Sequence, residues 1–252
     1  MINIDIIPCL IDNYSYVIND QESNLVGVID PSEFEAIDLF ISKKYKKIDY
    51  IFNTHHHIDH IGGNKKLKLK YKSKIFGSYI DKSRIPEIDF TLKDNEIFKF
   101  GKHLFKALLV PGHTKGHIAF YCEKEKIIFS GDTLFSLGCG KVFEGTHEEM
   151  FNSLNKLKSL PKNIKIYCGH EYTRNNLDFC LSIDSNNSFL TKKKVAIARQ
   201  NKNCTIPTTM EEELKTNIFL RCDNNSLKSI LKMNGASDKD IFSKLRVLKD
   251  SF

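Results

Sequence analysis

The stretch Asn53-Thr-His-His-His-Ile-Asp-His60 decides how the rest of this chain can be interpreted. It holds four groups of the kind that bind zinc or iron: His55, His57, Asp59 and His60. An imidazole must be neutral to coordinate a metal, and groups crowded in this way would repel one another on protonation unless a cation held them. The stretch therefore predicts a metal site rather than a solvated polar loop.

Three further donors follow apolar runs that resemble buried strands, and a fourth run leads into the histidine motif. Loops at the carboxyl ends of strands converge above a rigid sheet, so separate strands would deliver their donors to one place. The resulting seven donors are too many for one tetrahedral zinc and suit two ions that share a carboxylate. The runs and donors are residues 48–52 before His55, 104–110 before His113, 127–129 before Asp132, and 164–168 before His170.

The other histidines receive indirect roles. His56 is expected to point away from the donors, because side chains alternate along an extended loop. His117 is expected to pack behind the site, and His103 and His147 are expected to face solvent.

The amino-terminal region predicts a sheet followed by a helix. Residues 4–8, 14–18 and 25–29 are short runs rich in Ile, Val and Tyr, separated by turn residues. Ser32 and Glu35 then form a capping-box pattern, after which apolar residues recur at helical spacing.

Composition indicates a soluble protein. The 252 residues are 41% hydrophobic, and no run of about eighteen apolar residues suggests a membrane span. The first eight residues lack the pattern of a signal peptide, so the mature protein is expected to begin at residue 1. Seven scattered cysteines without a C-x-x-C motif favour a reduced compartment, and we expect a cytoplasmic protein.

The charge is modestly basic. The 38 basic and 31 acidic residues leave a net charge of +7, which fits an anionic small molecule, nucleic acid, or no particular partner. Residues 64–74 hold six lysines, and the segment is interpreted as the solvated face of a helix or strand. A nucleic-acid surface would need interleaved aromatic residues or a known module.

From about Tyr172 onward strand signals vanish and helical periodicity replaces them, which predicts a small helical domain. In its last helix Ile241, Leu245 and Leu248 are expected to face the core. Arg246 and Lys249 would then share a neighbouring face. The expected helices are one through Leu177, Cys180 and Leu181, one over residues 187–200, one opened by Thr208 or Thr209 with Glu211 or Glu212, and one opened by Ser237 with Asp240.

Four motifs resemble the signatures of the metallo-β-lactamase superfamily: residues 55–60, 111–114, 130–133 and 168–170. The resemblance implies an α/β (α+β) protein, a four-layer αββα sandwich with metals at the edge where the two sheets meet. It also implies a distribution of the ligands: His55, His57 and His113 on the first metal, Asp59, His60 and His170 on the second, and Asp132 between them.

Longer stretches resemble glyoxalase II, the hydroxyacylglutathione hydrolases, over essentially the whole chain. This implies a catalytic domain over residues 1–171 and a helical, glutathione-binding domain over residues 172–252. The implied reaction is hydrolysis of S-(2-hydroxyacyl)glutathione, foremost S-D-lactoylglutathione, to glutathione and D-lactate in methylglyoxal detoxification. The matching stretches are residues 12–14, 135–146, 169–173 and 207–214, with Asn217 and Phe219.

The same resemblance implies the substrate contacts. Arg246 could hold a glutathione carboxylate in two-point fashion. Phe143 stands where the family often has tyrosine, and the missing phenolic hydrogen bond should cost about 0.5–1.5 kcal/mol of binding. The implied contact residues are Lys141, Phe143, Tyr172, Arg246 and Lys249.

The mechanism expected from this family uses two divalent metal ions, with zinc preferred and iron or manganese as alternatives. They lower the pKa of bound water to about 7, and the resulting hydroxide attacks the thioester. Asp59 and Asp132 are the expected catalytic residues. The glutathione thiolate, with a pKa near 8.5, can leave without a general acid. Cys139 has no evident base partner and is interpreted as structural, and the protein is expected to act as a monomer without nucleic-acid or membrane partners.

Three other functions stay open at this point. A glutathione persulfide dioxygenase of the same superfamily would use one iron, so the full second set of ligands and the helical domain argue against it. A metal-dependent nuclease would use the lysine-rich segment and would bind RNA with steep salt dependence. A non-enzymatic metal or nucleic-acid binding module would turn over no thioester.

Overall fold

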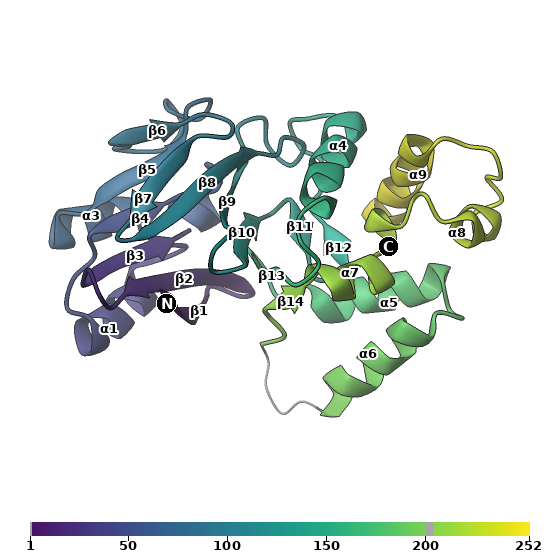
Figure 1. Cartoon of the computed structure of the whole chain (residues 1–252), viewed down its shortest axis with the longest axis horizontal. Coiled ribbons are helices and arrows are strands. Elements are labelled where there is room, and N and C mark those ends of the chain that lie inside the picture. Colours follow the sequence, from purple (N-terminus) through teal and green to yellow (C-terminus); the bar gives the residue numbers. More distant parts are fainter. Residues whose placement is uncertain (1, 200–203) are drawn as a thin grey trace.

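The computed structural model describes residues 2–199 and 204–252, and they form four layers in the order helices, sheet, sheet, helices (Figure 1). The first sheet has the strand order β1-β2-β3-β4-β5-β6, antiparallel from β1 to β3 and parallel from β3 to β6. Its strands are β1 (Ile2–Cys9), β2 (Asn13–Asp20), β3 (Leu25–Ile29), β4 (Tyr50–Phe52), β5 (Lys74–Ser78) and β6 (Phe90–Leu92).

The second sheet has the order β14-β13-β10-β9-β8-β7, in which only the pair β10 and β13 is parallel among the described strands. A separate two-stranded hairpin, β11 (Leu134–Phe135) with β12 (Gly138–Cys139), follows β10. The strands of the second sheet are β7 (Ile97–Phe100), β8 (His103–Leu109), β9 (Ile118–Cys122), β10 (Ile127–Gly131), β13 (Lys165–Cys168) and β14 (Thr208–Thr209).

Helices cover the outer faces of both sheets, and most of the chain after residue 172 is helical (Figure 1). Helices α1 (Phe34–Lys44), α2 (Ile58–Ile61) and α3 (Asn64–Tyr71) belong to the amino-terminal half, and α4 (His147–Lys158) follows β12. The carboxyl-terminal elements are α5 (Thr173–Ile183), α6 (Ser188–Arg199), α7 (Met210–Thr216), the 3-10 helix η1 (Ile218–Leu220), α8 (Asn225–Ile230) and α9 (Asp238–Asp250).

Three buried hydrophobic clusters fill the three spaces between the layers. The space between the sheets is largely aromatic and includes Phe52, Phe120 and Phe129. Strand residues alternate between faces, so Ile18 points into this central cluster while Val17 points to the other side, toward α1 and α3. The expected αββα sandwich is therefore confirmed.

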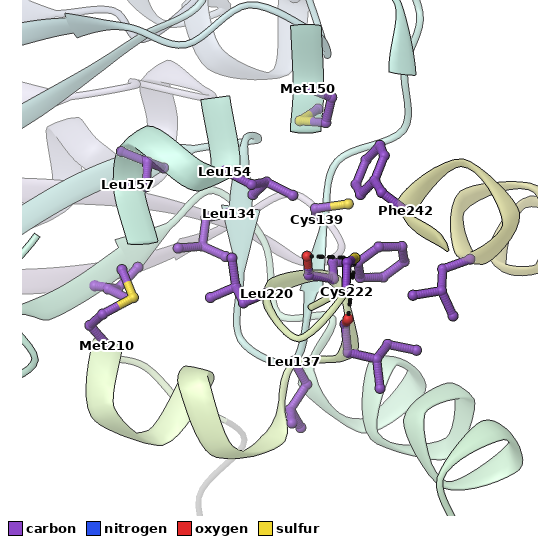
Figure 2. Packing of buried hydrophobic residues seen from close by; sticks show 14 of the residues in the cluster. Leu134, Leu137, Cys139, Met150, Leu154, Leu157, Met210, Leu220, Cys222 and Phe242 are labelled. Carbon is purple, nitrogen blue, oxygen red and sulfur yellow. Dashed lines mark hydrogen bonds between the residues drawn. The ribbon is translucent and has the colours of Figure 1, made fainter. Parts of the chain in front are cut away.

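The carboxyl-terminal helices share one hydrophobic core with the second sheet. Figure 2 shows Met150 and Leu154 of α4 facing the β11–β12 hairpin, with Met210 of α7 and Phe242 of α9 closing the same cluster. The helices therefore pack directly behind the loop that follows β10. In the last helix Ile241 and Leu245 are fully buried and Leu248 is partly buried, as its spacing predicted.

The expected helix starts are largely confirmed. The hydroxyl of Thr209 accepts a hydrogen bond from the backbone N–H of Glu212, and that of Ser237 accepts one from Asp240. The predicted capping box at Ser32 and Glu35 is wrong. Helix α1 begins at Phe34 without a side-chain cap.

Ser32 has other partners than the helix. Its backbone N–H donates to the hydroxyl of Ser15, and its own hydroxyl contacts the Asp30 carbonyl. A tertiary contact thus uses the residue that the local pattern assigned to the helix start.

Three further predictions need correction or limits. His103 does not face solvent: it is fully buried, with Nδ1 3.1 Å from a Glu125 oxygen and Nε2 3.6 Å from an Asp20 oxygen. Strand signals do not end at Tyr172, because Thr208 and Thr209 pair with β13. Met1 and Gln200, which the expected segments include, lie outside the described residues.

The lysine-rich segment forms α3 and the start of β5. Ion pairs use most of its lysines, because Lys66, Lys68 and Lys70 each lie within 3.0 Å of a carboxylate oxygen of the first half of the chain. Lys74 is paired with Asp89 at 3.2 Å. A surface whose charges are paired attracts nucleic acid poorly, so the nuclease hypothesis loses its main support.

None of the described helices is long and apolar enough to cross a membrane.

Candidate metal centre

The seven predicted donors come together at one edge of the sandwich. Strand β4 ends just before the histidine motif, and the single turn of α2 carries Asp59 and His60. The loop after β8 supplies His113, β10 ends immediately before Asp132, and β13 ends two residues before His170. Convergence at the carboxyl ends of strands is what the sequence analysis expected of these loops.

The donors form two groups. His55, His57 and His113 each offer one ligand atom, and these atoms lie within 4.8 Å of one another. Asp59, His60 and His170 form a second group of the same size. A nitrogen–nitrogen approach of 3.0 Å between His57 Nδ1 and His113 Nε2 shows how closely the first group is gathered.

Asp132 lies between the two groups. Its Oδ2 is 3.5 Å from His113 Nε2 and 3.2 Å from His170 Nε2, while its Oδ1 is 3.4 Å from His60 Nε2. One carboxylate thus faces donors of both groups. Buried His and Asp clusters arranged in this way are typical of a dinuclear metal site.

The donor set fits cations because several of its atoms lack any other partner. His55 Nε2, His60 Nε2 and Asp132 Oδ1 are buried without a hydrogen bond. Buried polar atoms are normally hydrogen-bonded, so unpaired atoms that face one another need an explanation. A cation bound between them provides one.

Several of the candidate ligand rings are held from behind by groups that the sequence analysis did not identify. Thr54 Oγ1 lies 3.0 Å from His55 Nδ1, and Asp30 Oδ2 lies 3.0 Å from His60 Nδ1. Such partners fix which nitrogen faces the metal and how the ring is oriented. Asp30 follows β3 as the donors follow their strands, so the strand-end rule could have found it.

Two further rings and the Asp59 carboxylate are held in a similar way. Asp12 Oδ1 lies 2.8 Å from His170 Nδ1, and the backbone carbonyl of Lys141 accepts from His113 Nδ1 at 2.8 Å. Asn13 donates from Nδ2 to the Asp59 carboxylate at 3.0 Å. A carbonyl acceptor carries no side-chain signal, which is why sequence reasoning could not find the contact of Lys141.

Burial and charge divide the histidines into two kinds. Burial holds the pKa of His55 well below its ordinary value and, with His113 nearby, lowers that of His57 to about 4. Burial also opposes protonation of His60 and His170, yet the Asp132 carboxylate outweighs it and raises the pKa of His170 to about 10. The negative field that would hold a proton there favours a metal cation in its place.

Two glycines allow the loops to approach this closely. A Cβ added at Gly169 would lie 2.2 Å from Asp132 Oδ1. At Gly131, where φ is +49°, it would lie 2.5 Å from Thr54 Oγ1. Both positions therefore need a residue without a Cβ, and the left-handed backbone at Gly131 favours glycine further.

The remaining histidines of the motifs pack around the donors. His56 points away from them, as expected, and its Nδ1 lies 3.3 Å from Asp81. His117 accepts the backbone N–H of Asp132 at 3.0 Å and stacks on His55 with ring centroids 4.8 Å apart. His117 thus packs behind the site, as predicted.

Three of the five predicted substrate contacts lie beside the donors. The ring of Tyr172 stacks on His170 with centroids 4.7 Å apart, and the exposed ring of Phe143 lies 5.3 Å from His113. Lys141 Nζ lies 5.7 Å from the centroid of the Phe143 ring. These residues form an aromatic and basic rim.

The two cations of α9 lie behind this rim. Arg246 is buried and donates to the Cys139 carbonyl at 2.9 Å, while Asp250 lies 3.0 Å from its other terminal nitrogen. These contacts use the donors that a two-point bond to a glutathione carboxylate would need. Lys249 contacts Asn175.

Cys139 is itself buried, which raises its thiol pKa, and the other six cysteines are also free.

Known proteins similar to this chain match it along its whole length. A family model described as the metallo-beta-lactamase superfamily matches residues 11–170, and one described as the hydroxyacylglutathione hydrolase C-terminus matches residues 171–252. The hydroxyacylglutathione hydrolase of Pelagibacter ubique (strain HTCC1062) is 49% identical over 251 residues, which are 99% of each chain. That of Brucella ovis is 43% identical over 246 residues, 97% of this chain and 96% of the other.

Solved structures agree on the fold. The BLEG-1 B3 metallo-beta-lactamase superposes with a TM-score of 0.67 and 21% identity, covering 87% of this chain and 99% of that one. At this identity the likeness concerns the fold alone. Together, the two family models and the full-length relatives show that the chain belongs to the hydroxyacylglutathione hydrolases (glyoxalase II) of the metallo-beta-lactamase superfamily.

Proposed function

We propose that this chain hydrolyses the thioester of S-(2-hydroxyacyl)glutathione, with S-D-lactoylglutathione as the main substrate, to glutathione and D-lactate. One observation carries the proposal: two groups of mostly buried donors meet around Asp132 in a chain that is similar to hydroxyacylglutathione hydrolases over 99% of its length. We further propose that it acts as a monomer in the cytoplasm, in methylglyoxal detoxification.

The donors would hold two divalent ions, with zinc preferred and iron or manganese as alternatives. When bound, such ions make water a strong nucleophile at neutral pH and polarise the carbonyl of an ester or thioester. The proposed ligands are His55, His57 and His113 for one ion, Asp59, His60 and His170 for the other, and Asp132 for both.

Asp59 and Asp132 have different surroundings and therefore different roles. The side chain of Asp59 is 32% exposed and held by Asn13, so it can both bind metal and orient the attacking water. Asp132 is 7% exposed and its backbone N–H donates to His117, which suits a fixed ligand. The leaving thiolate needs no proton donor, because its pKa of about 8.5 makes it a good leaving group.

The rim would bind the glutathione part of the substrate. Phe143 and Tyr172 offer apolar surface, and Lys141 and Lys249 offer positive charge toward the glutathione carboxylates. Arg246 would remain bound to the Cys139 carbonyl and contribute positive charge near the substrate, without a two-point bond to a glutathione carboxylate. In this proposal residues 1–171 form the catalytic domain and residues 172–252 the helical domain that binds substrate.

The test is hydrolysis of S-D-lactoylglutathione, with metal content determined on the same sample. The parent protein should turn over substrate with two metals per chain, and Asp132→Ala should lose most metal and activity together. Asp223→Ala removes an exposed carboxylate from a surface ion pair and serves as the control. Two metals retained in Asp132→Ala would contradict the ligand assignment.

A second experiment tests the glutathione contacts. Replacing Arg246 and Lys249 together should raise KM for a glutathione thioester far more than for a small neutral thioester. An equal change for both substrates would mean that these cations do not recognise glutathione.

A further inference from the structure

Arg84 is the centre of a polar network beside the first group of donors. It lies in the turn after β5 and contacts three side chains that come from different loops. Its Nη2 is 2.5 Å from Asp81 Oδ1, its Nη1 is 3.2 Å from His56 Nε2, and the same Nη1 bonds the Glu144 carboxylate. One planar guanidinium can serve several acceptors in this way, which an ammonium cannot.

The first arm of the network reaches the histidine motif. His56 Nδ1 lies 3.3 Å from Asp81 Oδ2 and its Nε2 lies 3.2 Å from Arg84 Nη1, so the tautomer with its proton on Nδ1 satisfies both contacts. The Asp81 side chain is fully buried, and a Cβ at Gly116 would lie 2.1 Å from its Oδ1. His56 is the one histidine of its run that faces away from the donors. Anchoring it therefore turns its neighbours on both sides, His55 and His57, inward.

The second arm reaches His113 and the rim. Glu144 Oε2 accepts the backbone N–H of Lys115 at 2.9 Å, and the backbone N–H groups of Phe143 and Glu144 each lie 3.3 Å from the His113 carbonyl. The Lys141 carbonyl in the same loop accepts from His113 Nδ1. Glu144 thus ties the loop of Lys141 and Phe143, which orients the His113 ring, to the loop that carries His113 and Lys115.

We propose that Arg84 is a positioning residue: through His56 and Glu144 it holds the two loops that carry His55, His57 and His113 in register. This goes beyond the proposed function and rests on it for the assignment of the metal ligands and for the kinetic readout. Arg84 contacts none of the donors of the second group in the described structure. Its loss should therefore weaken one of the two bound ions selectively.

The test measures metal retention against a graded series of chelator concentrations, which needs no substrate. Arg84→Met keeps the length of the side chain and removes the charge and all hydrogen bonds. Loss of groups that orient metal ligands typically costs 10–100-fold in metal affinity or activity. One of the two metals should leave Arg84→Met at a chelator concentration lower by about that factor, while the other leaves as in the parent.

The control is Lys102→Met, which removes the cation of the ion pair with the exposed Glu22. Lys102 lies just before β8, and the opposite end of β8 leads to His113. A strand of seven residues is about 20 Å long, so it separates Lys102 from the site by about that distance. Metal retention in this variant should match the parent within twofold. If Arg84→Met fails to fold, Arg84→Lys replaces it, since a lysine keeps the charge and can bond only part of the network.

A double-mutant cycle with Glu144→Gln identifies the route. If Arg84 acts through Glu144, the double variant should lose no more metal affinity and kcat than the more damaged single variant. Additive losses, an equal weakening of both metals, or retention like that of the parent would overturn the proposal. A parent protein that binds two metals and cleaves no thioester would refute the proposed function and leave this inference standing.

Discussion

The buried carboxyl of Glu213 offers the sharpest test of the packing between the helices and the β11–β12 hairpin. Glu213 is fully buried on α7. Its Oε2 accepts from the Leu137 backbone N–H at 2.7 Å and from Asn217 Nδ2 at 3.0 Å, and its Oε1 accepts from Thr208 Oγ1 at 2.7 Å. The group therefore ties a carboxyl-terminal helix to the loop that follows Asp132.

Burial raises the pKa of Glu213 from 4.5 to about 7, against the opposing effect of its hydrogen-bond donors. A carboxyl whose pKa is higher in the folded than in the unfolded protein stabilises the fold fully below pH 4.5. That contribution is lost as the pH rises from 4.5 to about 7. At 1.36 kcal/mol per pKa unit, the loss amounts to about 3 kcal/mol.

The perturbation is Glu213→Gln, which keeps the shape and cannot ionise. Its carbonyl oxygen can accept from Leu137 and Asn217, and its amide can donate to Thr208, whose own hydrogen can turn to Glu212 at 3.1 Å. The variant should nearly match the parent at pH 4.5 and exceed it by about 3 kcal/mol at pH 8. Glu213→Ala leaves buried donors unpaired and should lose at least about 2 kcal/mol at pH 4.5. Because alanine cannot ionise either, its deficit relative to the parent should be about 3 kcal/mol smaller at pH 8.

The assay is urea-induced unfolding of parent and variants at several pH values, in chelator so that metal binding does not contribute. All other titrating groups are shared, so the difference between parent and Glu213→Gln isolates this carboxyl. A difference that does not change between pH 4.5 and 8, or that grows toward acid pH, would refute the reasoning.

Three further predictions concern the metal centre and its rim. Gly169→Ala forces a Cβ to 2.2 Å from Asp132 Oδ1 and should lower metal content and activity together, as measured by metal analysis of the purified variant. Phe143→Tyr supplies a phenolic hydroxyl at an exposed position and should lower KM for a glutathione thioester by up to about tenfold, with kcat little changed; an unchanged KM would exclude a hydrogen bond there. Chelation of the metals should abolish hydrolysis, and added zinc should restore it, as followed by the thermal unfolding midpoint and by activity.

The sequence by itself determined the candidate ligands, and its resemblance to the metallo-β-lactamase superfamily implied the layers of the fold. Apolar runs of strand length end shortly before His113, Asp132 and His170. Loops at the carboxyl ends of strands converge, so this local order by itself points to one shared site. The helical period after Tyr172 likewise predicted the carboxyl-terminal helices, except for the two-residue strand β14.

Only the tertiary structure decided which polar residues act at a distance. Ser32 follows a local capping pattern, yet it bonds Ser15. His103 was predicted to face solvent, yet it lies buried between Asp20 and Glu125. Arg246 resembled a surface cation and is turned onto the Cys139 carbonyl. The partners named here lie 17 to 107 residues away in the chain, and the Cys139 carbonyl is a backbone group that every residue has. Local pattern cannot register such contacts, because they exist only once distant segments have packed.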